Sequence, residues 1–274
     1  MRPPLQSATV LVTGASSGIG REVARQLAPL ARALVLVARR EERLVELAEE
    51  LRARHGSLRI SVQRCDLADR PAVDRMLGAA VGEVGEIDVL VNSAGFGDVA
   101  LLESASWQKL EQMVQVNVVA LTYLTRRLIE PMLRRGRGGV LNISSSLGLI
   151  FLPGFAAYSG TKHYVTAFSE SLRSELRGTG VVVSQVCPGP VATEFLEVAG
   201  NPLGRDVPRF LQISAERCAR IALRAFARGR ALVVPGLLMK LSIGLGRLTP
   251  RWLLRGVFAL FARMLRKRQP MVGR

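Results

Sequence analysis

The sequence predicts a doubly wound parallel α/β sheet over residues 1–236, followed by a separate C-terminal extension over residues 237–274. Two observations predict this class. Seven short runs are continuously apolar and rich in Val, Ile and Leu, which is typical of strands covered on both faces. Helical patterns lie between these runs, and strands that alternate with helices form parallel sheets. No internal repeat or low-complexity linker divides the first 235 residues, so they form one domain.

The elements follow in a regular order. We expect strands at 8–13, 33–37, 58–63, 87–91, 139–143, 181–186 and 231–234, and helices at 19–28, 41–54, 71–81, 107–134, 157–176 and 215–228. Pro71 and Ser214 suit helix starts, because proline lacks the N–H that a first turn leaves unpaired and serine accepts from that turn. With 49% hydrophobic residues the chain can fill a large core.

The three cysteines are far apart and match no metal-ligand spacing, so neither a disulfide framework nor a metal site is expected. The N-terminal segment has no charged stretch followed by a secretory apolar run. These features predict a reducing, cytoplasmic location, with the option of a peripheral position at a membrane surface.

The net charge of +16 is concentrated near the C-terminus. Fourteen basic residues and no acidic one follow Glu216, which leaves 24 basic and 22 acidic residues in positions 1–216. No nucleic-acid-binding motif or aromatic-rich stripe accompanies the charge, so nucleic acid is not an expected partner.

Residues 251–267 predict an amphipathic helix. Its two arcs are Arg251, Arg255, Arg263 and Arg266 on one side and Leu253, Val257, Leu260, Phe261 and Met264 on the other. Such a helix could dock on an anionic membrane surface. The alternative is that its apolar arc packs on the core or on a second subunit, with the arginines solvated.

A glycine-rich turn follows the first expected strand and opens the next helix. Glycines permit a sharp turn and a close backbone approach, and the helix N-terminus favours an anion such as a pyrophosphate. The residues expected to bind the dinucleotide there are Gly14, Ser16, Ser17, Gly18, Ile19 and Gly20. A merely tight turn is the alternative.

The end of the second strand bears on the choice between NAD and NADP. An NAD site usually has a carboxylate there for the ribose hydroxyls. This chain has Ala38 followed by Arg39 and Arg40, and a guanidinium can bind a 2′-phosphate. NADP(H) is therefore favoured over NAD(H), unless the arginines are only solvated charges beside Glu41 and Glu42.

Tyr158 and Lys162 are four residues apart and so share one face of a helix. A free phenol has a pKa of ~10, and a nearby ammonium favours the phenolate, so we expect Lys162 to lower the Tyr158 pKa. Ser145 lies thirteen residues before Tyr158, at the end of the fifth strand, and Asn117 lies in the preceding long helix. Ser144 and Ser146 are adjacent alternatives for the serine.

Together these motifs resemble the short-chain dehydrogenase/reductase family over residues 8 to about 235. Three further segments support the resemblance: Asp66-Leu67, Asn92-Ser93-Ala94-Gly95 and Pro188-Gly189-Pro190-Val191-Ala192-Thr193. By resemblance, Asp66 and Leu67 contact the adenine, and Asn92, Ala94 and Gly95 brace the sheet and line the cofactor site. Pro188, Gly189, Val191 and Thr193 would hold the nicotinamide carboxamide. Ser93 departs mildly from the family's second Asn.

The resemblance also implies roles for the catalytic set. Tyr158 would exchange a proton with the substrate oxygen, Ser145 would hold that oxygen, Lys162 would bind the ribose and tune Tyr158, and Asn117 would position a water. A Rossmann-type fold and a homodimer formed by the 107–134 and 157–176 helices are also implied.

A lipophilic substrate is expected from the apolar segments after Ser145 and between Thr193 and Ser214, and from similarity to membrane-associated members that reduce 3-oxoacyl, steroid or retinoid carbonyls. The alternative function is a non-catalytic NADP-binding scaffold or a membrane-surface interaction protein.

Overall fold

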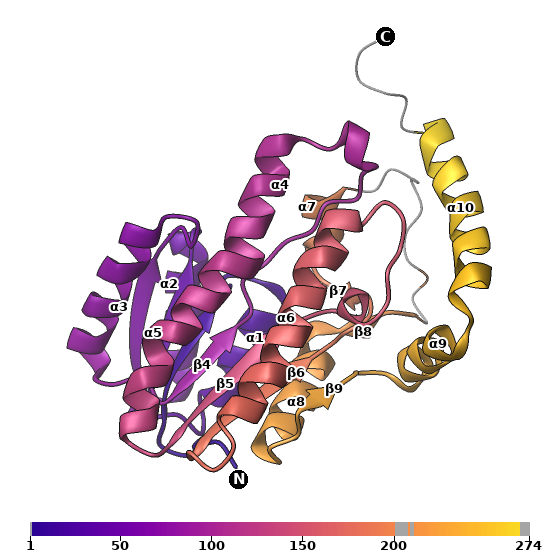
Figure 1. The fold of residues 1–274 in the computed structure, drawn as a ribbon. Helices are drawn as coiled ribbons and strands as arrows, with labels where there is room; N and C mark the ends of the chain where they lie inside the picture. The colour runs from indigo at the N-terminus through magenta and orange to yellow at the C-terminus, as the bar shows by residue number, and fades with distance from the viewer. Residues whose placement is uncertain (1, 201–207, 209–210, 269–274) are drawn as a thin grey trace.

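A computed structural model describes residues 2–200, 208 and 211–268 (Figure 1). Its main sheet has seven parallel strands in the order β3-β2-β1-β4-β5-β6-β9. The strands are β1 (Thr9–Thr13), β2 (Ala33–Ala38), β3 (Arg59–Arg64), β4 (Val89–Asn92), β5 (Gly138–Ile143), β6 (Val181–Val186) and β9 (Leu232–Val233). The predicted doubly wound fold is therefore confirmed, and each expected strand is present within one to two residues at its ends.

Helices cover both faces of the sheet (Figure 1). One face packs against α1 (Gly18–Leu27), α2 (Glu41–Arg54) and α8 (Ala215–Ala227). The other packs against α3 (Arg70–Val84), α5 (Leu121–Arg134) and α6 (Ala156–Glu175). Both faces of the central strands are buried, which explains why their sequences are continuously apolar rather than alternating.

The helix expected over 107–134 has three parts. These are α4 (Trp107–Val114), a π-helical segment (Gln115–Ala120) and α5. The π segment contains Asn117, whose side chain bonds to the backbone of Phe96 at two points. Single π turns are rare and occur often at functional sites. Here the π turn contains Asn117, whose side chain contacts the loop after β4.

A helix that periodicity does not predict follows the sheet: α9 (Leu237–Leu248), which precedes α10 (Arg251–Arg268). The glycines within α9 lower its intrinsic helix propensity. Tertiary contacts compensate, because Ile243 and Met239 pack with Cys187 and Val234 of the main domain. A short second sheet joins β7 (Val191–Ala192) to β8 (Ile213–Ser214), and a one-turn helix, α7 (Phe195–Ala199), lies between them in the chain.

The strand order reverses direction between β1 and β4. In open parallel sheets, ligands bind outside the carboxyl ends of the strands at such a switch point. The turn after β1 and the loop after β4 meet there, because a Cβ on Gly14 would lie 2.9 Å from the Cα of Ala94. The fold thus brings together the two motifs that the sequence places eighty residues apart.

Candidate active site

The turn between β1 and α1 is shaped as an anion-binding cradle. Gly14 and Gly18 have φ angles of +68° and +55°, a region that side-chain-bearing residues rarely adopt. A Cβ on Gly20 would lie 2.4 Å from the Gly14 carbonyl oxygen, so the turn closes only with glycine there. No side chain caps the α1 N-terminus, and its first turn holds no acidic residue. Its N–H groups are therefore directed at a site that suits a phosphate.

The loop after β4 is held to this cradle by one hydroxyl group. Thr13 Oγ1 accepts hydrogen bonds from the backbone N–H groups of Ser93 and Ala94, at 3.0 and 3.1 Å. Asn92 itself is buried below the loop. Its Nδ2 donates to Asn142 Oδ1 (2.9 Å) and to Thr125 Oγ1 (3.1 Å). The Asn92 side chain therefore braces the sheet, while the backbone beyond it forms the cleft.

Arg40 reaches across the glycine-rich turn. Its guanidinium donates to Ser17 Oγ at 2.9 Å and to Ser16 Oγ at 3.3 Å, and it pairs with Glu194 at 2.8 Å. Arg43 binds the other Glu194 oxygen, and Arg43 and Arg40 together lower the pKa of that carboxyl. Arg39 is exposed. Arg43 and Glu194 were not among the predicted residues, because only the fold brings positions 43 and 194 together.

The four predicted catalytic residues converge at the carboxyl edge of β5. Tyr158 and Lys162 are both buried on α6, with the Lys162 Nζ 5.8 Å from the Tyr158 ring centroid. The Ser145 side chain lies beside the Tyr158 phenol and acts to lower its pKa. A Cβ on Gly95 would lie 2.8 Å from Asn117 Oδ1 and 3.5 Å from Lys162 Nζ. Glycine at this position therefore leaves room for the loop backbone between the two side chains.

The neighbouring serines face elsewhere. Ser144 Oγ lies 3.2 Å from the Lys162 carbonyl oxygen and 3.0 Å from Thr166 Oγ1, under α6. The Ser146 N–H donates to the Pro188 carbonyl at 2.7 Å and ties this loop to the one after β6. Of the three adjacent serines, Ser145 is the one that acts on the pKa of the Tyr158 phenol.

Burial dominates the acid–base properties of the pair. Desolvation raises the pKa of Tyr158 to about 12, against a smaller lowering by the Ser145 hydrogen bond. Desolvation also lowers the pKa of Lys162 to about 8. The Lys162 ammonium donates to the Ile143 carbonyl at 3.0 Å. The expected lowering of the Tyr158 pKa by Lys162 is therefore not found, and the phenol is a protonated donor at neutral pH.

The depressed Lys162 pKa predicts a pH-dependent contribution to stability. Between about pH 8 and 10.5 the unfolded chain binds more protons at this lysine than the folded chain, so its contribution to the unfolding free energy rises with pH. We expect the wild type to gain about 1 kcal/mol relative to Lys162→Met between pH 7 and pH 9. Urea denaturation of both proteins at the two pH values measures this. A constant difference would show that the ammonium is not desolvated.

The segment after β6 closes the cleft from the other side. A Cβ on Gly18 would lie 3.1 Å from Thr193 Cγ2, so Thr193 contacts the glycine-rich turn. On its outer side this segment meets α9, because a Cβ on Gly189 would lie 2.4 Å from Met239 Cε. Val191 pairs with Ile213 in the β7–β8 sheet. The segment predicted to hold the nicotinamide is thus supported by α9.

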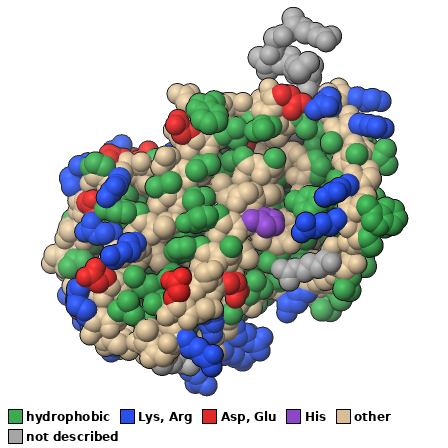
Figure 2. Space-filling model, viewed as in Figure 1, with side chains coloured by type: hydrophobic (Ala, Val, Ile, Leu, Met, Phe, Trp, Pro, Cys, Tyr) green, Lys and Arg blue, Asp and Glu red, His purple; other side chains and the backbone are tan. Residues whose placement is uncertain are grey.

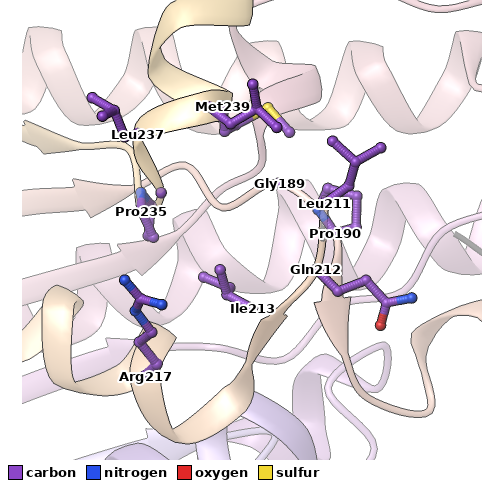
Figure 3. Close-up of a pocket in the computed structure, with 11 residues that line it drawn as sticks. Gly189, Pro190, Leu211, Gln212, Ile213, Arg217, Pro235, Leu237 and Met239 are labelled. Atoms are coloured by element: carbon purple, nitrogen blue, oxygen red, sulfur yellow. The ribbon is translucent and has the colours of Figure 1, made fainter. Parts of the chain in front are cut away.

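A hollow of about 180 Å³ lies behind this segment (Figure 3). The hollow lies between the start of α9 and the residues around β8, and among its lining residues are Gly189, Ile213, Arg217 and Met239. None of the four predicted catalytic residues is among the described residues that line it. We therefore place the chemistry on the opposite side of the segment, beside Tyr158.

The predicted adenine-contacting residues lie at the end of β3. Asp66 follows Cys65, whose N–H extends the ladder to Ala38. Asp66 Oδ1 accepts from the Ala68 N–H at 3.0 Å, which fixes the turn into α3. Leu67 packs at the margin of the core cluster on that face. Both residues therefore lie at the same sheet edge as the glycine-rich turn.

Aromatic rings surround the Tyr158 phenol. The centroids of Phe195 and Phe155 lie 5.4 and 6.3 Å from that of Tyr158. A Cβ on Gly97 would lie 2.6 Å from Phe195 Cζ, so the α7 ring packs directly on the loop after β4. The environment of the acid–base group is apolar. Part of the predicted apolar segment between Thr193 and Ser214, residues 201–207 and 209–210, lies outside the described residues.

The apolar run after Ser145 divides between two environments. Leu149 and Ile150 pack on the cluster that includes Ile243 of α9. Phe151 and Leu152 instead line an open cavity of about 330 Å³, together with Phe258 of α10. Leu149 and Ile150 thus pack against α9, whereas Phe151 and Leu152 face the open cavity beside α10.

The fold and this arrangement define a class of protein: a Rossmann-like domain with a dinucleotide cradle beside a Ser–Tyr–Lys acid–base set. The chain matches the short chain dehydrogenase family over residues 8–202, and it belongs to that family. It is 34% identical to the human protein "Dehydrogenase/reductase SDR family member 7" over 232 residues, covering 81% of this chain and 68% of that protein.

Solved structures of family members have a similar fold. A short-chain dehydrogenase of Sphingobium yanoikuyae in complex with NADPH aligns with a TM-score of 0.77 at 29% identity, covering 89% of this chain and 96% of the other. A family member of Burkholderia phymatum in complex with NAD gives 0.78 at 25% identity, with 88% and 92% covered. Both nicotinamide cofactors therefore occur among structures similar to this one.

Proposed function

We propose that this protein is an NADP(H)-dependent oxidoreductase that interconverts a hydrophobic carbonyl compound and its secondary alcohol, with Tyr158 as the general acid and base. The observation that carries the proposal is the burial of the Tyr158 phenol together with Ser145 and the Lys162 ammonium, whose Nζ lies 5.8 Å from the Tyr158 ring centroid. This set lies at the carboxyl edge of the sheet, where the glycine-rich turn offers a phosphate site.

The residues of the cleft fit the cofactor. The pyrophosphate would lie on the free N–H groups of the α1 N-terminus, and Arg40 lies directly beside that turn for a 2′-phosphate. Thr193 and Val191 would hold the nicotinamide end, and Asp66 and Leu67 the adenine. When bound, NADPH would supply the hydride.

Each side chain has a definite task in carbonyl reduction. Tyr158, protonated at neutral pH, donates its proton to the carbonyl oxygen as negative charge develops there. Ser145 donates a second hydrogen bond to the same oxygen and fixes its position. Lys162 holds the ribose, and Asn117 positions a water for reprotonation of the phenol. In alcohol oxidation the same groups act in reverse.

The surroundings of Tyr158 support an apolar substrate. The rings of Phe155 and Phe195 pack around the phenol, and Phe151 and Leu152 line the nearby 330 Å³ cavity. An apolar wall cannot solvate a charged substrate, so a long-chain or polycyclic ketone suits it better than a small polar one.

NADPH oxidation tests the proposal directly. The purified full chain is incubated with NADPH and a panel of long-chain and cyclic ketones, and absorbance at the reduced-nicotinamide band is followed. We expect turnover with at least one lipophilic ketone and little with short hydroxy acids. Tight NADPH binding without turnover across the panel would favour the alternative, a cofactor-binding scaffold.

A homodimer is part of the same proposal. The end of α4, the π segment and α6 expose Val114, Val119 and Tyr164, which are 41%, 46% and 39% exposed. A self-complementary contact through these helices would cover the apolar side chains. Light scattering that gave a monomer mass at micromolar concentration would contradict it.

A further inference from the structure

The two C-terminal helices use only one side to bind the domain. On α10, Leu265 is buried against Gly154, where an added Cβ would lie 2.9 Å from Leu265 Cδ1. The Phe258 ring meets Phe151 edge-on at 5.3 Å. Arg266 pairs with Glu103 at 2.5 Å. These contacts fix α10 along the edge of the molecule (Figure 1) and leave its other sides exposed.

A row of apolar side chains lies on a second, uncovered side of α10. Leu253, Val257, Leu260 and Met264 follow the helical spacing i, i+4, i+7, i+11 and are 45–61% exposed. Half of the large exposed hydrophobic side chains among the described residues, ten of twenty, lie between residues 237 and 264. This concentration is not the scattered exposure that a soluble surface normally carries.

The exposed row is accompanied by positive charge alone. Residues 237–274 contain nine basic residues and no acidic one. Arg251, Arg255 and Arg263 are exposed on α10. Figure 2 shows basic and hydrophobic side chains interspersed along the edge where Figure 1 places α10. In the described part of the chain, Arg266 is the α10 residue with an acidic partner.

We propose that α9 and α10 dock the protein on an anionic lipid bilayer. The row Leu253, Val257, Leu260 and Met264 enters the boundary between headgroups and acyl chains, and the basic side chains bind anionic headgroups. A helix with an apolar side and a basic side that lies in the bilayer surface has this composition. Within the described residues no helix is long and apolar enough to span the membrane.

Charge decides between a bilayer and a second copy of the chain. A symmetric contact between two α9–α10 faces would place two surfaces of like positive charge together, which opposes association. An anionic bilayer satisfies the apolar and the basic groups at once. α10 also lines the open cavity that Phe151 and Leu152 line.

The structure also shows which variant should not be used. Deleting residues 237–274 would remove Ile243 from the cluster that it forms with Val234 and Cys187, and would remove Met239 from Gly189. The deletion would therefore damage the nicotinamide segment as well as the surface. Substitutions confined to the exposed row avoid this.

Co-sedimentation of the full chain with liposomes tests docking. The vesicles are pure phosphatidylcholine or phosphatidylcholine with 30% phosphatidylglycerol. We expect binding to the anionic vesicles that is reduced in 0.5 M NaCl, and weak binding to neutral ones. The triple variant Val257→Gln, Leu260→Gln, Met264→Gln should bind the anionic vesicles about 10- to 100-fold more weakly.

Two controls make the result specific. The matched variant Val45→Gln, Val81→Gln removes exposed apolar side chains from α2 and α3 and should bind like the wild type. Circular dichroism should show both variants folded. Equal binding by the triple variant and the wild type would overturn the proposal. So would a triple variant that changes the oligomer mass in light scattering while the wild type ignores liposomes, since the face would then be a subunit contact.

Discussion

Replacing Tyr158 with Phe is expected to lower kcat for ketone reduction by about 10²- to 10⁴-fold, the usual contribution of a positioned general acid. The ring remains, so its packing against Phe155 and Phe195 is kept. Only the hydroxyl that meets Ser145 is lost. Because no contact to the phosphate end of the cleft changes, the NADPH Kd should stay within about 3-fold. Steady-state kinetics and a fluorescence titration with NADPH measure the two quantities.

The same helix supplies the control for this variant. Tyr164→Phe is the identical chemical change six residues along α6, at a half-exposed ring whose hydroxyl lies 2.9 Å from Thr122 Oγ1. We expect its kcat to equal that of the wild type within about 2-fold. If Tyr158→Phe retained comparable activity, the proton would come from another group and the proposed mechanism would fail.

The second large effect concerns cofactor choice. The double variant Arg39→Gln, Arg40→Gln is expected to weaken NADPH binding about 100-fold, because a 2′-phosphate would lose charge-assisted hydrogen bonds of roughly 1.5–3 kcal/mol each. NADH carries no 2′-phosphate, so its Kd should change by less than about 3-fold. Titrations at fixed ionic strength measure both. Arg54→Gln removes a charge from the far end of α2 and should leave both affinities unchanged.

A substitution at Glu194 is expected to change the NADPH affinity in the opposite direction. Its carboxylate pairs with Arg40 and Arg43 and would compete with the phosphate for them. Glu194→Gln should therefore tighten NADPH binding by up to about 10-fold, with NADH unaffected. If both cofactors lost affinity equally in the arginine variant, the arginines would support the fold of the turn rather than recognise the phosphate.

The local pattern of the chain was enough to predict most of the fold. Buried parallel strands must be apolar on both faces, so each strand appears as a short continuous run, and each helix between them shows a 3.6-residue period. The ends of α2 and β6 agree with prediction to the residue. The glycine-rich turn could be predicted because positive φ angles at Gly14 and Gly18 require a specific residue type.

The C-terminal helices show where local pattern was insufficient. The glycines of α9 make its helical propensity low, and only contacts of Ile243 and Met239 with the domain stabilise it. For α10, prediction opposed packing on the core to exposure of a single apolar arc. Phe258 and Leu265, which pack on the core, lie outside the predicted arc, and four of its five members, Leu253, Val257, Leu260 and Met264, remain exposed.

The sequence by itself determined the residue types of the chemistry: a phenol and an amine one helical turn apart, a serine at a strand end, and glycines where the backbone must turn. Only the tertiary structure decided the pKa values and the ion pairs of the side chains in the site. Burial by segments remote in sequence raises the Tyr158 pKa and lowers that of Lys162, and the pairing of Arg40 and Arg43 with Glu194 spans 154 and 151 residues. Solvation and long-range ion pairs depend on which segments meet, and no local pattern encodes that meeting.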